Sequence, residues 1–214
     1  MKLHGTEEIT LELEGWIPTD RAREIIGNEL EVITKESKTP IRLQVSRLIN
    51  RGSEKLPLAS LNYSQGVWRI GVKHGGISSW FIPLCDTDSS LGRLVNAKVF
   101  KLEVRKADFL FMEKRKSLVT HHRPITGGEM MCHVELGPEQ PPCNDLKPTY
   151  IRSKGSLYQI PQSEEPAAFR RSSRVDVVKD DISVQVFGVP VDWSSICLVE
   201  RGRVDYSESA ERVM

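Results

Sequence analysis

The sequence lacks the local motifs by which many enzymes and exported proteins are recognised. It has no G-x-S-x-G nucleophile motif, no G-x-x-x-x-G-K-[ST] phosphate loop and no G-x-G-x-x-G dinucleotide motif. No apolar run approaches the roughly 18 residues of a membrane-spanning helix, and residues 1–8 are polar and acidic where a secretory signal would be apolar. We therefore expect a cytoplasmic protein that is not secreted, with a peripheral membrane or nuclear location as alternatives.

Cysteine is also scarce. Four cysteines occur in 214 residues, at Cys85, Cys132, Cys143 and Cys197, and they do not have the close spacing of a zinc-binding or redox pair. In a reducing compartment such scattered cysteines are free thiols. The pattern argues against a fold held together by disulfides.

The overall composition is that of a globular protein. Hydrophobic residues make up 39% and charged residues 28% of the chain, so wholesale disorder is excluded. The length fits one domain. We place this α+β domain at residues 1–205, with loop insertions near 121–131, 137–148 and 163–173, and expect a frayed tail at 206–214.

The first half of the chain shows both helical and strand patterns. Residues 8–14 alternate apolar and polar, which predicts a half-buried strand, and apolar residues at helical spacing predict a helix from Asp20 to Glu31. Thr39-Pro40 is a typical helix start and Gly52 a typical stop, so residues 40–51 are predicted to form a second helix.

The rest of the chain favours strands. Gly75-Gly76 separates two alternating segments, 67–72 and 77–82, as in a β-hairpin, and their aromatic residues are expected in the core. Further strands are expected at 94–105, 107–112, 132–136, 150–151, 157–160, 175–178, 182–189 and 195–199. The predicted fold class is α+β: an N-terminal strand and two helices, followed by a mostly antiparallel β-sheet or sandwich.

Histidines and cysteines gather in one region and could ligate zinc. The weak candidates are His121, His122, Cys132, His133 and Cys143. Adjacent residues on a strand point to opposite faces, so each His-His or Cys-His pair offers one ligand easily. We therefore favour no metal site and no cofactor, with zinc as the alternative.

One other chemical pattern is interpreted as ordinary structure. Asp86-Thr87-Asp88 has the form of a D-x-D metal clamp, but Ser89 and Ser90 follow it, and such a polar run is typical of a turn. No catalytic residue is assigned.

Charge is unevenly distributed along the chain although the net charge is only +1. Residues 1–36 hold four basic and nine acidic residues, whereas residues 37–75 hold seven basic and one acidic. Residues 98–123 are again basic, and residues 175–214 hold four basic and eight acidic residues. The acidic segments either pair with the basic ones inside one monomer or bind the basic face of a neighbouring copy.

The basic blocks are the candidates for binding RNA phosphates or lipid headgroups. These anion-binding candidates are Arg42, Arg47, Arg51, Lys55, Arg69, Lys73, Arg105, Lys106, Lys114, Arg115 and Lys116. Ser173, in Arg170-Arg171-Ser172-Ser173-Arg174, is a candidate phosphorylation site at which added negative charge would weaken anion binding.

The order of elements in about the first 85 residues resembles the core of rhabdovirus matrix proteins. The similar parts are the strand at 9–13, the helices at 20–31 and 40–51, and the strand at Gly66-Val67-Trp68-Arg69-Ile70. This resemblance implies a self-assembling viral protein that bridges a nucleoprotein to a membrane.

We therefore expect a non-enzymatic structural protein of matrix type. Its expected partners are further copies of itself, bound through complementary charge, a nucleoprotein or RNA, and an anionic membrane surface; no small-molecule substrate is evident. The alternatives are an RNA-binding viral movement protein, which would likewise be rich in β-structure, and a metal-dependent enzyme.

Overall fold

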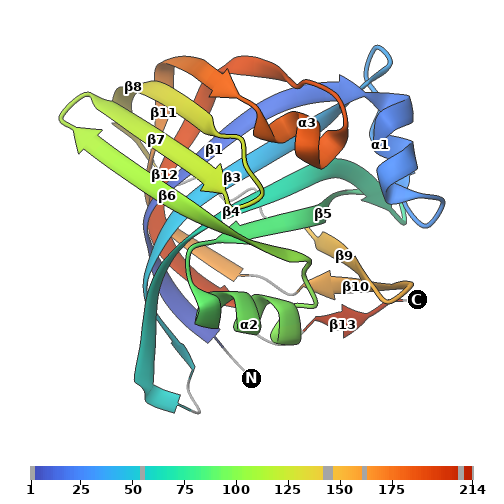
Figure 1. The fold of residues 1–214 in the computed structure, drawn as a ribbon, viewed down its shortest axis with the longest axis horizontal. Coiled ribbons are helices and arrows are strands. Elements are labelled where there is room, and N and C mark those ends of the chain that lie inside the picture. The colour runs from blue at the N-terminus through green and yellow to red at the C-terminus, as the bar shows by residue number, and fades with distance from the viewer. Residues whose placement is uncertain (1–2, 54–55, 142–146, 161–162, 207–209, 214) are drawn as a thin grey trace.

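The structure, a computed structural model, describes residues 3–53, 56–141, 147–160, 163–206 and 210–213, with side chains described for a smaller part. It is mostly β-sheet (Figure 1). The strands are β1 (Leu3–Pro18), β2 (Glu31–Val32), β3 (Lys38–Ser53), β4 (Leu56–His74), β5 (Ile77–Thr87), β6 (Val104–Lys114), β7 (Ser117–Pro124), β8 (Met130–Gln140), β9 (Thr149–Ser153), β10 (Ser156–Ile160), β11 (Ser163–Asp180), β12 (Asp192–Tyr206) and β13 (Glu211–Arg212). The helices are α1 (Thr19–Ile26), α2 (Ser90–Val99) and α3 (Ile182–Phe187).

Within the described residues, nine strands pair into a closed ring. Their order is β5-β6-β7-β8-β11-β12-β1-β3-β4, and the ring closes because β4 also pairs with β5. All of these pairings are antiparallel except β5–β6, which is parallel and follows the crossover through α2. The edge of β5 that pairs with β6 at Cys85–Thr87 pairs with β9 nearer its start, at Trp80 and Phe81, and β9-β10-β13 forms a short additional layer (Figure 1).

Two strands of the ring, β4 and β5, are buried on both faces. One face of β1, β3 and β4 contributes Leu11, Leu13, Leu43 and Trp68 to the main core inside the ring. The opposite face of β4 and β5 packs on α2 and β9-β10 in a second core. Because successive side chains of a strand point to opposite faces, neighbouring residues of β4 and β5 belong to different cores.

The second helix expected from the sequence is wrong, since residues 40–51 lie in β3. Thr39 and Pro40 begin no helix; Ile41, Leu43 and Val45 are buried in the main core, while the residues between them face the other side. Side chains that face the main core therefore recur in this segment with the period of two that is typical of a strand. Pairing with β1 and β4 along both edges outweighs the local start signal.

Two segments expected to be strands are helices. Residues 90–99 form α2, whose N-cap Ser89 accepts a hydrogen bond from the backbone N–H of Gly92 at 3.0 Å. Residues 182–187 form α3, which ends at Gly188 with a φ of 71°. The segment 163–173, expected as a loop, is part of β11.

Other expectations are confirmed. The strand at 8–14 lies in β1, the helix expected at 20–31 is the shorter α1, and Gly75-Gly76 forms the β4–β5 hairpin turn with positive φ at both residues. The coarse assignment to a β-rich α+β fold is therefore correct. Among the described residues, no helix is long and apolar enough to cross a membrane.

Candidate functional site

Two clusters of buried charged side chains lie on opposite faces of β4 and β5. The Asp86 cluster consists of Trp68, Asp86, Arg105 and His122 and lies in the ring interior. The Glu12 cluster consists of Glu12, Arg42, Gln44 and Arg69 and lies on the other face of β1, β3 and β4. Since isolated charges are rarely buried, each cluster is a candidate site.

In the Asp86 cluster, one carboxylate contacts three other strands. Asp86 is fully buried and accepts hydrogen bonds from Trp68 Nε1 at 3.1 Å and from Arg105 Nε at 2.6 Å and Nη2 at 3.0 Å. His122 Nε2 lies 3.1 Å from Asp86 Oδ2, an ion-pair distance without hydrogen-bond alignment. The His122 ring stacks on Phe109 with 4.5 Å between ring centroids.

The environment keeps Asp86 ionised. Burial alone would raise the pKa of this carboxyl, but the contacts and electrostatic attraction of His122 and Arg105 outweigh burial and lower the pKa below its ordinary value of 3.8. Arg105 then extends outward to Thr126 and Gln185, at 3.3 and 3.2 Å. Both oxygens of the fully buried Asp86 carboxylate are bonded to neighbouring side chains, so the cluster fits a structural role that joins β4, β5, β6 and β7.

The Glu12 cluster is held together by strand register. In the strand register, Glu12 of β1 lies opposite Gln44 of β3, and Arg42 of β3 lies opposite Arg69 of β4. Arg42 Nη1 lies 2.8 Å from Glu12 Oε2, whereas Arg69 Nη1 lies 3.8 Å from Oε1. The Arg69 guanidinium also donates to Gln44 Oε1.

These side chains are nearly closed off from solvent. Their exposed fractions are 8% for Glu12, 13% for Arg42 and 10% for Arg69. Arg42 also contacts Glu14 and lies over the Trp80 ring, 4.8 Å from its centroid. The buried Nε of Arg69 has no hydrogen-bond partner among the described residues, so this guanidinium retains a donor for a further anionic group.

Further buried polar side chains extend this face along β1, β3, β4 and β5. Thr10 donates to Ser46 at 2.9 Å, and Thr87 donates to the Ser64 carbonyl at 3.0 Å. Gln65 is also buried. These groups make the face that carries the Glu12 cluster polar although it is buried.

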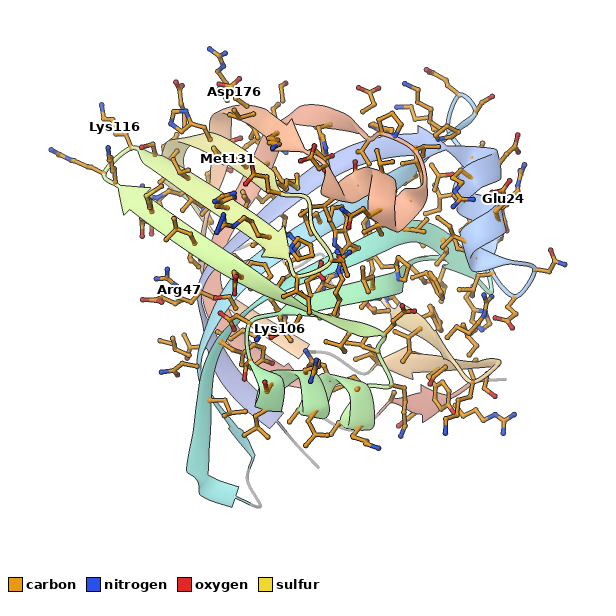
Figure 2. All side chains as sticks on the ribbon, in the orientation of Figure 1. Glu24, Arg47, Lys106, Lys116, Met131 and Asp176 are labelled. Carbon is orange, nitrogen blue, oxygen red and sulfur yellow. The ribbon has the colours of Figure 1, made fainter. Side chains whose placement is uncertain are left out.

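The basic residues predicted to bind an anion do not form one surface. Arg42 and Arg69 belong to the Glu12 cluster and Arg105 to the Asp86 cluster, whereas Arg47 pairs with Glu8 and Lys73 with Glu31. Lys106, Lys114, Arg115 and Lys116 are exposed, and Figure 2 shows Lys106 and Lys116 towards opposite ends of β6. The side chains of Arg51, Lys55 and Ser173 lie outside the described residues. Acidic residues of the first segment thus pair with basic residues of the second inside one monomer.

The metal candidates are also separated. His121 contacts Glu129 at 2.7 Å, and His133 is exposed, while His122 and Cys132 lie in the ring interior. Burial raises the pKa of the Cys132 thiol to about 12, which disfavours the thiolate that zinc requires. Among the described residues no group of three or more His, Cys, Asp or Glu could hold a metal ion. Cys143 lies outside those residues.

Sequence reasoning missed Glu12, Gln44 and Asp86 as members of charged clusters. Asp86 was expected in a turn but lies in β5. Glu12 was read only as the polar side of an amphipathic strand. No local signal marks it, because its partners Arg42 and Arg69 lie 30 and 57 residues further along the chain.

The fold is that of acetoacetate decarboxylase-like enzymes. An acetoacetate decarboxylase structure matches with a TM-score of 0.78 and 11% identity, covering 100% of this chain and 89% of that one. The enduracididine biosynthesis enzyme MppR, complexed with pyruvate, matches with a TM-score of 0.75 and 11% identity over 98% of this chain and 90% of that one. An acetoacetate decarboxylase-like enzyme from Sphingomonas wittichii RW1 has a TM-score of 0.75 and 10% identity, covering 99% and 92%.

No family model and no curated protein matches the sequence. At 10–11% identity the structural matches establish the fold.

These matches correct the functional expectations. The resemblance to rhabdovirus matrix proteins is wrong, because it depended on a second helix that is β3, and the matching structures are enzymes. The non-enzymatic, self-assembling matrix protein with nucleoprotein, RNA or membrane partners is wrong for the same reason, as is the expectation of no small-molecule substrate. The movement-protein and metal-enzyme alternatives also find no support.

Proposed function

We propose that the chain is an enzyme that performs acid–base chemistry on a small carbonyl compound carrying a carboxylate, at the Glu12 cluster. The supporting observation is a buried carboxylate beside two guanidinium groups, in a fold shared with acetoacetate decarboxylase and with a protein complexed with pyruvate. Planar guanidinium groups match carboxylates geometrically, so Arg69 suits the substrate carboxylate or a carbonyl oxygen that gains charge.

The chemistry follows from the positions of the charges. Glu12 Oε1, the oxygen farther from an arginine, would take a proton from the carbon next to the carbonyl. The C–H electron pair then forms a carbon–carbon double bond, and the carbonyl π pair moves onto oxygen. A guanidinium stabilises the resulting enolate. Return of a proton to carbon regenerates the substrate, and the same enolate would follow loss of carbon dioxide from a β-oxo acid.

A lysine imine is the other common route for carbonyl substrates. None of the lysines with a described side chain is buried, and the half-buried Lys147 lies with its Nζ 6.0 Å from the centroid of the Trp80 ring that Arg42 also contacts. The acid–base route therefore has better support than an imine.

The test is hydrogen–deuterium exchange of pyruvate and acetoacetate in heavy water, followed by proton NMR, together with acetoacetate decarboxylation. We expect Glu12→Gln to lower the enzyme-dependent rate by about 10²–10⁴-fold, the usual contribution of a general base. Glu8→Gln is the matched control, since Glu8 is also on β1 and pairs with an arginine, at 3.4 Å, outside the cluster. Its rate should stay within about twofold of the wild type.

The outcome that contradicts the proposal is also defined. If folded wild-type protein accelerates neither reaction, or if Glu12→Gln and Glu8→Gln behave alike, the Glu12 cluster is not the site of this chemistry. Borohydride reduction with pyruvate, followed by mass spectrometry, detects an imine; a covalent adduct absent from Lys147→Arg would replace the acid–base route with a lysine route.

A further inference from the structure

The ring of strands is closed between β11 and β12 over only part of their length, and the unpaired part is here called the seam. β11 and β12 pair from Ser163–Asp205 as far as Arg171–Leu198 and then separate. Beyond that point β11 stays paired only with β8, up to Asp180, and β12 only with β1, down to Asp192. Within the described residues, each strand therefore keeps one unpaired edge along the seam.

A groove of about 470 Å³ lies at this seam. Its lining is contributed by both strands and by α3, and includes Val175, Val177, Val178, Asp180, Ser183 and Trp193. Trp193 forms part of it and is fixed by a 2.8 Å hydrogen bond from its Nε1 to Asp180 Oδ2. The volume is within the range of ligand-binding sites.

Some hydrogen-bonding groups at the groove lack partners among the described residues, although on β12 the Cys197 N–H already donates to Ser172 Oγ at 2.8 Å and the Ile196 N–H to Ser194 Oγ at 3.2 Å. On a strand with one free edge, the N–H and C=O groups of every second residue point away from the sheet, and such edges are templates for another strand. Ser183, whose exposed fraction is 1%, also lines the groove, and its Oγ has no hydrogen-bond partner among the described residues. Both observations indicate an occupant with its own backbone-like donors and acceptors.

The charge around the groove is acidic. Its charged lining residues are Asp176, Lys179 and Asp180; Asp176 is paired with Arg174 at 3.0 Å, and Lys179 is bound by Glu129 at 2.8 Å and Asp181 at 3.3 Å, so carboxylates outnumber basic groups around the groove. Residues 175–214 contain eight acidic and four basic residues. An occupant with basic ends complements this surface.

We propose that the seam binds an extended peptide segment with apolar residues at alternate positions and basic residues at its ends, which adds as a strand between β11 and β12. Main-chain hydrogen bonds to the two edges supply affinity, and the valines lining the groove receive the apolar side chains. This binding site is separate from the Glu12 cluster and does not depend on the function proposed there.

The probe is the acetylated and amidated peptide Lys-Val-Thr-Val-Thr-Lys, titrated into the full chain by calorimetry and by amide NMR shifts. We expect saturable binding with shifts concentrated at residues 174–179 and 193–197. The same peptide with both valine amides N-methylated should bind at least about tenfold more weakly, because it lacks the donors that a strand edge requires.

Matched protein variants locate the binding. Val178 lines the groove and is 64% exposed, so Val178→Arg should weaken binding by about tenfold without unfolding the chain. Leu110→Arg, at a position 48% exposed on β6, should bind as the wild type does. The proposal is overturned if the peptide shows no binding at about 5 mM, if N-methylation has no effect, or if pyruvate rather than the peptide shifts the groove amides.

Discussion

Asp86 shows how much one buried residue can organise. Its carboxylate contacts Trp68 on β4, Arg105 on β6 and His122 on β7, so a single side chain joins three strands to β5. On the opposite face of β4, directly after Trp68, lies Arg69 of the Glu12 cluster. The Asp86 cluster thus fixes from inside the ring the strand that carries a proposed substrate-binding residue.

We expect Asp86→Asn to destabilise the chain by about 3–5 kcal/mol, because it leaves the Arg105 guanidinium without its buried counter-charge. The folded pKa of Asp86 lies below 3.8, so the unfolded chain binds the proton more readily. The stability from this carboxyl is therefore present above about pH 4 and is lost as pH falls through the folded pKa. Urea unfolding between about pH 3 and 7 should show a smaller acid-dependent loss in Asp86→Asn than in the wild type. Asp108→Asn, at an exposed position on β6, is the control and should match the wild type.

At the scale of elements, a serine hydroxyl at the seam between β11 and β12 takes the place of a backbone carbonyl as hydrogen-bond acceptor. The Cys197 N–H donates to Ser172 Oγ at 2.8 Å, just beyond the last paired residues of the two strands. The Ser172 hydroxyl therefore accepts a hydrogen bond from a backbone N–H that the β11–β12 ladder leaves unpaired. Ser183 on α3, by contrast, carries a buried hydroxyl with no partner among the described residues.

The two serines should respond differently to removal of the hydroxyl. Ser172→Ala leaves the buried Cys197 N–H unpaired and should cost about 1–3 kcal/mol in the free energy of unfolding. Ser183→Ala removes a buried hydroxyl that makes no hydrogen bond to the described residues, so the free energy of unfolding should stay the same or rise by up to about 1 kcal/mol. Denaturant unfolding of both variants provides the comparison; equal losses would show that Ser183 Oγ has a partner in solution.

Element prediction succeeded where the local pattern and the tertiary environment agree. The alternation at 8–14 and the glycine pair at 75–76 are sufficient to define β1 and the β4–β5 turn. At 40–51 they disagree: Thr39-Pro40 favours a helix start, but β1 and β4 hydrogen-bond β3 on both edges. That pairing involves residues far away in sequence, so a local reading cannot include it.

At the scale of the whole molecule, the Glu12 cluster could be predicted only in part. Arg42 and Arg69 were among the expected anion-binding residues, but for RNA or lipid. To predict that they lie beside Glu12 and Gln44, one must know the register of two strand pairs: Glu12 lies opposite Gln44 in β1–β3, and Arg42 lies opposite Arg69 in β3–β4. Charge blocks along the chain predicted pairing between segments without showing which residues meet.

The molecule as a whole also protects its thiols. Cys85, Cys132 and Cys197 are buried, and burial raises the pKa of both Cys132 and Cys197 to about 12. We therefore expect at most one of the four cysteines to react rapidly with Ellman's reagent in the native protein at about pH 8, and all four in denaturant. Two or more fast native thiols would contradict this arrangement.

The position of β1 has a consequence for synthesis on the ribosome. β1 pairs with β12 from Leu3–Tyr206 to Trp16–Asp192, so the two ends of the chain meet at one ladder. A nascent chain emerges from its N-terminus, so this ladder cannot form until β12 has been synthesised. Until then one edge of β1 has no native partner, and such contacts between distant residues are slow to form. The ladder between β1 and β12 therefore forms only after the strands between them have been synthesised, and the interval before it forms is when a chaperone would be of most use.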